Sequence, residues 1–203
     1  MKRFLIALTF VAISFTASAQ QKKEYTILPS DVQVKIALQA APKEFRDNAK
    51  VLGYNEKGEL ITLKEGTNGY ICLAPDYKMP SYFSSYCYPE SLEPLMSRGR
   101  ELIAEGKRNQ RNEIRAKEFE EGKITMPTVP TTMYGYWGTL ENLNQETGEM
   151  TDAKRRYVIY VSGAKGSDLG LPNTPNNLGM PWLMDEGTYK AHIMITPPMD
   201  HKH

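Results

Sequence analysis

Residues Lys50–Ala74 read KVLGYNEKGELITLKEGTNGYICLA and hold three short apolar segments separated by two turns. The first turn, Asn55–Gly58, joins two segments rich in apolar and β-branched residues, which is the pattern of a β-hairpin. The second turn, Lys64–Gly69, leads into Tyr70–Ala74. Short connections of this kind join neighbouring antiparallel strands. The stretch therefore predicts a three-stranded antiparallel meander, which makes a β-sheet the centre of the fold.

The amino terminus has the three parts of a secretory signal peptide. Lys2 and Arg3 give a positive start, residues 4–15 form an apolar run, and residues 17–19 read ASA, a small-residue cleavage site. The run is too short to span a membrane, and no other apolar run approaches the ~20 residues that a spanning helix needs. We therefore predict cleavage after Ala19, no membrane span, and a periplasmic or secreted protein.

The charge of the mature chain bears on its partners. Cleavage leaves 184 of the 203 residues, enough for one domain with a hydrophobic core. It also lowers the number of basic side chains from 25 to 23, against 24 acidic ones. A net charge near −1 gives no long-range attraction for a polyanion. We expect no nucleic-acid partner.

Cys72 and Cys87 are the two cysteines of the chain. A pair of cysteines in an exported protein favours a disulfide over a redox or nucleophilic thiol. The spacing is not C-x-x-C, and Cys72 lies in an apolar segment where a thiolate would be poorly stabilised. We predict a structural disulfide between Cys72 and Cys87.

The segments on either side of the meander extend the fold. After a polar linker at residues 20–29, Ser30 or Asp31 is expected to cap a helix that stops at Pro42. The apolar residues of this segment alternate strictly, which also suits a strand, so both alternatives stay open. They are Val32, Val34, Ile36 and Leu38. Phe83–Tyr88 is expected to form a fourth strand, tied to the third by the disulfide.

From Glu90 the apolar spacing changes to that of a helix, which Gly106 is expected to end. The residues on its apolar face are Leu92, Leu95, Met96, Leu102 and Ile103. A second helix, residues 108–121, has few large apolar residues and should be mostly solvated. Basic and acidic side chains mix between Arg98 and Lys123, as on exposed helices with i,i+4 ion pairs.

The carboxyl-terminal third returns to strands. Residues 132–140 and 155–163 have the β-branched and aromatic content of strands. A Gly/Pro/Asn-rich loop, Gly163–Gly187, leads to a final strand, Tyr189–Ile195, and a polar tail at residues 199–203. Strands, two helices and more strands predict a single α+β domain at residues 30–198. It should have a mostly antiparallel β-sheet, an inserted helical hairpin and one disulfide.

The sequence has no recognisable catalytic constellation. Residues 163–170, GAKGSDLG, match neither a phosphate-binding loop nor a nucleophile elbow. A Ser-His-Asp arrangement stays open because its members need not be close in sequence. Its base would be His192, the only histidine before the last three residues, with Asp185 or Glu186 nearby. A hydrolase-like enzyme is therefore one alternative function.

Methionine offers a second alternative. His192 and Met194 share one face of the predicted last strand, and Met180 and Met184 could approach that face from the loop. Thioether and imidazole ligands suit Cu(I), so a copper or haem site is conceivable. Methionine more often fills irregular cores, and there is no H-x-x-x-H motif. We expect no cofactor and no metal site.

Aromatic side chains favour a binding function. Five of them crowd residues 76–90, namely Tyr77, Tyr82, Phe83, Tyr86 and Tyr88. Such residues are typical of binding surfaces, and equally of the cover of a small sheet. Our leading hypothesis is a non-enzymatic domain that binds a small molecule, a glycan or a protein partner. The candidate ligand contacts are His192, Trp182, Asn68 and Tyr70.

Three separated pieces of the chain form a recognisable pattern. EGTNGYIC at residues 65–72, the second cysteine at Cys87, and HIMI at residues 192–195 resemble an uncharacterised family of exported bacterial proteins. Its pattern is G-x-N-G-aromatic-x-C, a second Cys, and a terminal H-[IV]-M-[IV] strand. The resemblance implies an exported, disulfide-containing domain of unknown activity. The matching positions are Asn68, Cys72, Cys87 and His192.

Overall fold

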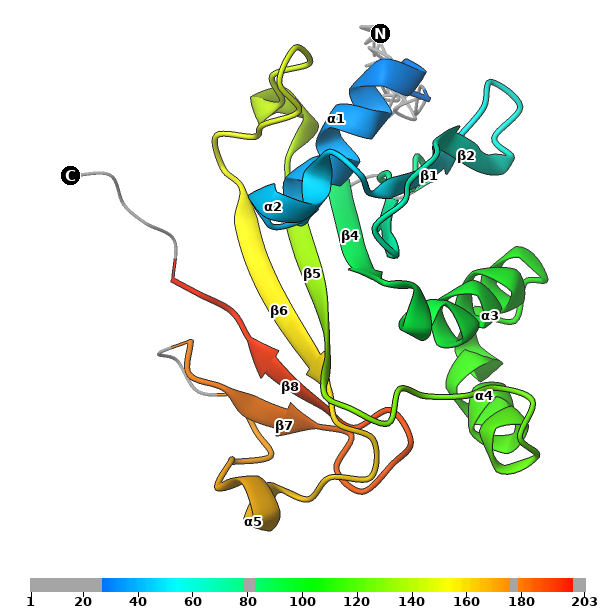
Figure 1. The fold of residues 1–203 in the computed structure, drawn as a ribbon, viewed down its shortest axis with the longest axis vertical. Coiled ribbons are helices and arrows are strands. Elements are labelled where there is room, and N and C mark those ends of the chain that lie inside the picture. The colour runs from blue at the N-terminus through cyan, green and yellow to red at the C-terminus, as the bar shows by residue number, and fades with distance from the viewer. Residues whose placement is uncertain (1–26, 79–82, 176–178, 199–203) are drawn as a thin grey trace, which may run out of the picture.

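The computed structural model describes residues 27–78, 83–175 and 179–198 (Figure 1). The predicted signal peptide at residues 1–19, most of the linker at 20–29 and the tail at 199–203 lie outside these ranges. The described strands are β1 (Lys50–Tyr54), β2 (Leu60–Lys64), β3 (Tyr70–Leu73), β4 (Phe83–Pro89), β5 (Thr131–Gly138), β6 (Lys154–Tyr160), β7 (Trp182–Met184) and β8 (His192–Ile195). The helices are α1 (Ser30–Ala40), α2 (Lys43–Arg46), α3 (Glu93–Ala104), α4 (Arg111–Glu120) and α5 (Gly166–Leu169).

These strands form one mixed sheet in the order β2-β1-β3-β4-β5-β6-β8-β7. Neighbouring strands are antiparallel except β1 and β3, which run parallel. The α+β prediction, with its mostly antiparallel sheet and one disulfide, is confirmed. The predicted meander is wrong in its third strand, because β3 pairs with β1 and not with β2. This position gives β3 a partner on each side, and it becomes an interior strand.

The connection from β2 to β3 explains this pairing. It crosses the start of β1, where the backbone N–H groups of Thr67 and Asn68 donate to the Asn48 carbonyl at 2.8 and 3.3 Å. Gly66 touches the β1 backbone so closely that an added Cβ would lie 2.1 Å from the Lys50 nitrogen. A residue without a side chain is therefore what lets the chain cross to the other side of β1.

One face of the sheet is covered by α1, which resolves the choice between helix and strand for this segment. Its buried side chains, Val32, Ile36, Ala37 and Ala40, pack in one core with the disulfide of β3 and β4. The predicted side-chain cap is wrong, since Ser30 is already helical and Pro29 precedes it without a capping side chain. The chain is extended at Ala41, just before Pro42, which agrees with the predicted helix end.

Gln33 fixes α1 to the sheet. Its side-chain amide donates to the Tyr54 carbonyl at 2.9 Å and accepts from the Tyr54 N–H at 2.8 Å. The amide also donates to the Leu28 carbonyl at 2.7 Å. Gln33 is 3 % exposed, so its hydrogen bonds satisfy a polar group that would otherwise be costly to bury.

The predicted helical hairpin is confirmed and lies between β4 and β5. In Figure 1, α1 and α2 lie over the upper sheet, while α3 and α4 form a separate pair beside it. The turn Glu90–Leu92 leads into α3, whose Leu95 and Leu102 are buried. Beyond α3, Gly106 has φ +77°, the left-handed conformation expected of a helix-ending glycine. Arg98 joins the pair by donating two hydrogen bonds to the Glu118 carboxylate from Nε and one from Nη2.

The predicted loop Gly163–Gly187 is only partly irregular, because it contains α5 and the edge strand β7. The final strand starts at His192 and not at Tyr189, which follows a tight turn. Asp185 has φ +57° and Gly187 has φ +72°, so both reverse the chain between β7 and β8. The sequence signal was weak because β7 is only three residues long.

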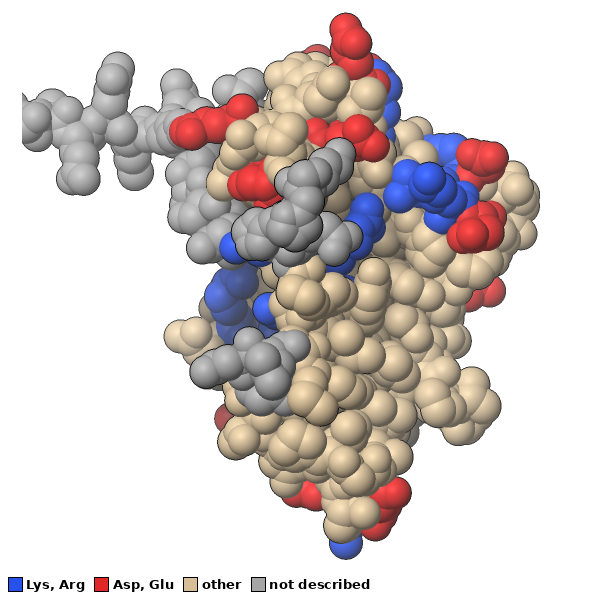
Figure 2. Space-filling model, turned by 90° about the vertical axis from the view of Figure 1, so that its left-hand side faces the viewer, with Lys and Arg blue, Asp and Glu red and all other residues tan. Residues whose placement is uncertain are grey.

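Within the described ranges no helix is long and apolar enough to cross a membrane. Figure 2 shows one side of the molecule. On it, Lys and Arg gather in the upper half with Asp and Glu close to several of them, and the lower half is almost uncharged down to its tip.

Candidate functional site

His192 lies on β8, opposite Tyr160 of β6 and Met184 of β7. Its side chain is 12 % exposed, and Nδ1 lies 2.7 Å from the Lys190 carbonyl oxygen. A carbonyl only accepts, so Nδ1 carries the proton. The Asp185 carboxylate is 4.0 Å from Nδ1 and accepts a hydrogen bond from Lys190 Nζ at 2.6 Å. The base and carboxylate expected in a catalytic triad are therefore not hydrogen-bonded to each other.

The environment of His192 makes a prediction about pH. Burial lowers the pKa of the imidazole below its ordinary value, and the Lys190 carbonyl and the Asp185 carboxylate offset only part of this. The unfolded chain then binds the proton more readily, so stability falls as pH drops below about 6.5. Urea unfolding at pH 7.5 and at pH 5.5 measures this loss. Between the two pH values, the free energy of unfolding should fall less in His192→Asn than in the wild type. An equal fall in the free energy of unfolding in both proteins would contradict a lowered pKa of His192.

Trp182 is half-buried on β7 and lies opposite Met194, while Met184 lies opposite His192. Adjacent strands therefore bring His192, Met184 and Met194 to one face of the sheet. No group of three or more His, Cys, Asp or Glu side chains among the described residues is placed to hold a metal ion. The expected absence of a metal or cofactor stays a prediction, and copper and haem stay alternative hypotheses.

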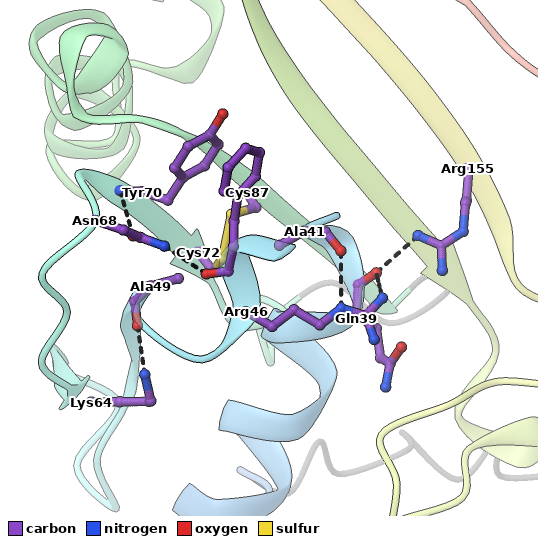
Figure 3. Close-up of a disulfide and its surroundings, with 11 residues drawn as sticks. Gln39, Ala41, Arg46, Ala49, Lys64, Asn68, Tyr70, Cys72, Cys87 and Arg155 are labelled. Carbon is purple, nitrogen blue, oxygen red and sulfur yellow. Dashed lines mark hydrogen bonds between the residues drawn. A yellow bond between two sulfur atoms is a disulfide. The ribbon is translucent and has the colours of Figure 1, made fainter. Parts of the chain in front are cut away.

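Asn68 and Tyr70 lie elsewhere, beside the disulfide (Figure 3). The Asn68 amide donates to the Phe45 carbonyl at 2.7 Å and its oxygen accepts from the Tyr70 N–H at 3.1 Å. The Tyr70 ring stacks on Phe45 with centroids 4.2 Å apart. These contacts join α2 to β3. Three strands separate β3 from β8, a distance of about 19 Å. The four predicted ligand contacts therefore form two separate groups.

A cleft that the sequence did not predict lies between the β1–β2 hairpin and α3. Its volume is about 860 Å³. The hairpin contributes Tyr54, Glu59 and Leu60, and α3 contributes Arg100, Glu101 and Ile103. Asp76, Lys78 and Arg108 complete the polar part of the lining. Clefts of this size with a few convergent polar groups are the usual sites of small-molecule binding.

Arg100 is the most firmly held charge of the cleft. Its Nη1 donates to the Tyr88 hydroxyl at 2.9 Å, and its Nη2 donates to the Glu93 carboxylate at 2.5 Å. The Tyr88 hydroxyl in turn donates to the other Glu93 oxygen at 2.8 Å. Burial raises the pKa of Tyr88, so the hydroxyl keeps its proton. This closed network fixes the guanidinium in the cleft wall.

The acidic groups of the cleft are already engaged. Glu101 pairs with Arg98 at 3.0 Å, Glu59 accepts from the Asn55 amide at 2.8 Å, and Asp76 accepts from the Lys78 N–H at 3.0 Å. By contrast, Lys78 and Arg108 form no ion pair with any residue that the structure describes. Burial also raises the pKa of Tyr54 to about 12, so its hydroxyl is a neutral donor at pH 7. The unoccupied hydrogen-bonding capacity of the cleft is therefore mainly that of cations and donors.

No protein family model, no curated protein and no solved structure matches this chain.

Proposed function

We propose that this protein is an exported, non-enzymatic binding domain that holds a small polar ligand in the cleft between the β1–β2 hairpin and α3. The observation that carries the proposal is that Lys78 and Arg108, two cations without ion-pair partners among the described side chains, line the same cleft as Arg100, which Tyr88 and Glu93 hold in place. Export rests on the amino-terminal signal sequence, and the Cys72–Cys87 disulfide agrees with an oxidising compartment.

The lining favours a hydroxylated ligand with one anionic group. Cations bind a carboxylate, while the second oxygen of each engaged carboxylate, in Glu59, Asp76 and Glu101, can accept from a hydroxyl group. Leu60 and Ile103 supply apolar walls for a carbon skeleton. A sugar acid combines these three properties. We therefore propose acidic glycan units as the ligand class.

The proposal predicts saturable binding of glucuronate, with glucose binding much more weakly. Lys78→Gln combined with Arg108→Gln should weaken glucuronate binding at least tenfold, since a hydrogen bond to a charged group contributes about 1.5–3 kcal/mol. Isothermal titration calorimetry measures both affinities. The matched control is Lys43→Gln with Lys154→Gln, two exposed residues outside the cleft that carry the same change of charge.

Native mass spectrometry of protein taken from a bacterial periplasm gives an independent check. A retained small ligand, lost in the Lys78→Gln and Arg108→Gln double variant, is the expected result. An apo mass together with no saturable binding of sugar acids would contradict the proposal.

A further inference from the structure

Arg115 of α4 is a buried charge that the cleft does not use. The residue is 8 % exposed, and its Nη1 donates to the Leu95 carbonyl at 3.1 Å. Its Nη2 donates to the Asn112 side chain at 3.0 Å. Both partners are neutral, and its buried Nε–H has no hydrogen-bond partner among the residues that the structure describes. A buried guanidinium without a counter-ion is costly, because burial removes the water that solvated its charge.

Two more buried polar groups of this region have no hydrogen-bond partner within the described part of the chain. They are Nε of Arg111, one helical turn before Arg115, and the hydroxyl of Tyr189. Tyr189 and Tyr160 both interact electrostatically with the two arginines, and the Tyr189 hydroxyl also lies beside the Arg115 guanidinium in a contact too poorly aligned to be a full hydrogen bond. We call Arg111, Arg115, Tyr160 and Tyr189 the arginine cluster. Three unsatisfied donors in one cluster are unusual, since buried polar groups in native proteins are nearly always paired.

The charges around the cluster do not balance. The acidic side chain that interacts with Tyr160 and Tyr189 is Asp185, and it already pairs with Lys190 at 2.6 Å. Glu118 of α4 is held by Arg98. No ion pair of Arg111 or Arg115 is formed within the described part of the chain. Burial, and to a smaller extent the proximity of Arg111, lowers the pKa of Arg115, while Tyr189 and Tyr160 offset part of the shift. Two positive charges thus remain without a negative partner.

The cluster lies at the contact between α3 and α4. Arg115 is buried against Gly99 of α3, where an added Cβ would lie 3.1 Å from its Nη1. Arg111 is only half-buried and is the first residue of α4. The positive end of the helix dipole therefore adds to the field at the outer arginine. The Nε atoms of both arginines and the Tyr189 hydroxyl have essentially no exposed surface, so an anion would reach them only when the half-buried Arg111 side chain moves outward.

We propose that the arginine cluster binds a tetrahedral oxyanion, phosphate or sulfate, either free or as an ester group of a larger molecule. The two Nε–H groups and the Tyr189 hydroxyl supply three donors, and a tetrahedral oxyanion offers acceptors in several directions. The anion also neutralises the uncompensated charge of Arg111 and Arg115. This site is distinct from the sugar-acid cleft, whose lining includes none of these residues.

Titration calorimetry of the purified protein with sodium phosphate and sodium sulfate, at constant ionic strength set by chloride, tests the proposal. Saturable binding is expected, and Arg111→Gln should weaken it at least tenfold. Tyr189→Phe should also weaken binding while leaving the melting temperature of the anion-free protein unchanged or higher, because it removes an unpaired buried hydroxyl. A merely structural tyrosine would lower the melting temperature and leave anion affinity unchanged, which would count against the site.

Lys117→Gln is the matched control, since it removes one positive charge from the exposed face of the same helix, outside both the cleft and the cluster. It should retain full phosphate affinity. Loss of phosphate binding in Arg108→Gln but not in Arg111→Gln would place the anion in the cleft and overturn the proposal. The absence of any saturable binding in the wild type would overturn it as well. Glycerol 1-phosphate distinguishes the two sources: tighter binding than inorganic phosphate indicates an ester, and weaker binding indicates the free anion.

Discussion

Replacing Cys72 and Cys87 together by alanine is expected to lower the free energy of unfolding by about 3 kcal/mol. The two residues lie directly opposite each other on β3 and β4 and are separated by 15 residues in the chain. The disulfide therefore reduces the conformational freedom of the unfolded chain and also joins two strands of the folded one. Both cysteines are 0 % exposed and pack against α1, so the truncation also removes core contacts. The melting temperature should fall by roughly 6–12 °C.

Reductant supplies the control for this effect. It should lower the melting temperature of the wild type and leave that of the double variant unchanged. Each single variant leaves one buried thiol, so both should resemble the double variant in stability. A wild-type protein that melts at the same temperature with and without reductant would contradict a stabilising role of the disulfide.

Gly66→Ala should have an effect of similar or greater size. The new Cβ would lie within 2.1–2.7 Å of three backbone atoms of residues 48–50, which cannot move aside as a flexible side chain can. Overpacking of a core by small increments costs about 1–3 kcal/mol, and a clash with backbone belongs at or above the upper end. Urea unfolding should show a loss of about 3 kcal/mol or more.

Gly69→Ala is the matched comparison, three residues further along the same connection. Gly69 has φ +72°, but the nearest atom to an added Cβ is 3.8 Å away on the Glu90 side chain. Only the left-handed backbone is then unfavourable, at about 1–2 kcal/mol. A larger loss in Gly69→Ala than in Gly66→Ala would show that the crossing of β1 does not depend on close backbone contact.

The sequence predicted local structure well wherever periodicity or turn chemistry is strong. The helical spacing from Leu92 to Ile103 and the turn Asn55–Gly58 correspond to α3 and to the β1–β2 hairpin. The parallel pairing of β3 with β1 could not be predicted in this way. Short connections favour antiparallel neighbours, and the exception depends on backbone contacts of Gly66 with residues that precede it by 16 to 18 positions.

The same pairing explains why the cleft was missed. Its walls, Tyr54 to Leu60 on one side and Arg100 to Ile103 on the other, are about forty residues apart in the chain. They approach because β3 lies between β1 and β4, which sets the hairpin beside the helix that follows β4. His192 stood out because histidine is rare in this chain, whereas nothing in composition distinguishes Arg100 or Arg115 from the other arginines.

Tyr54 contacts both α1 and the cleft. Its backbone N–H and carbonyl are both held by Gln33 of α1, and its side chain lines the cleft on the other side of the sheet. A ligand that shifts Tyr54 must also change how firmly α1 is docked, and the effect is reciprocal in free energy. Binding of a ligand that moves Tyr54 would therefore alter the two hydrogen bonds by which Gln33 docks α1 on the sheet.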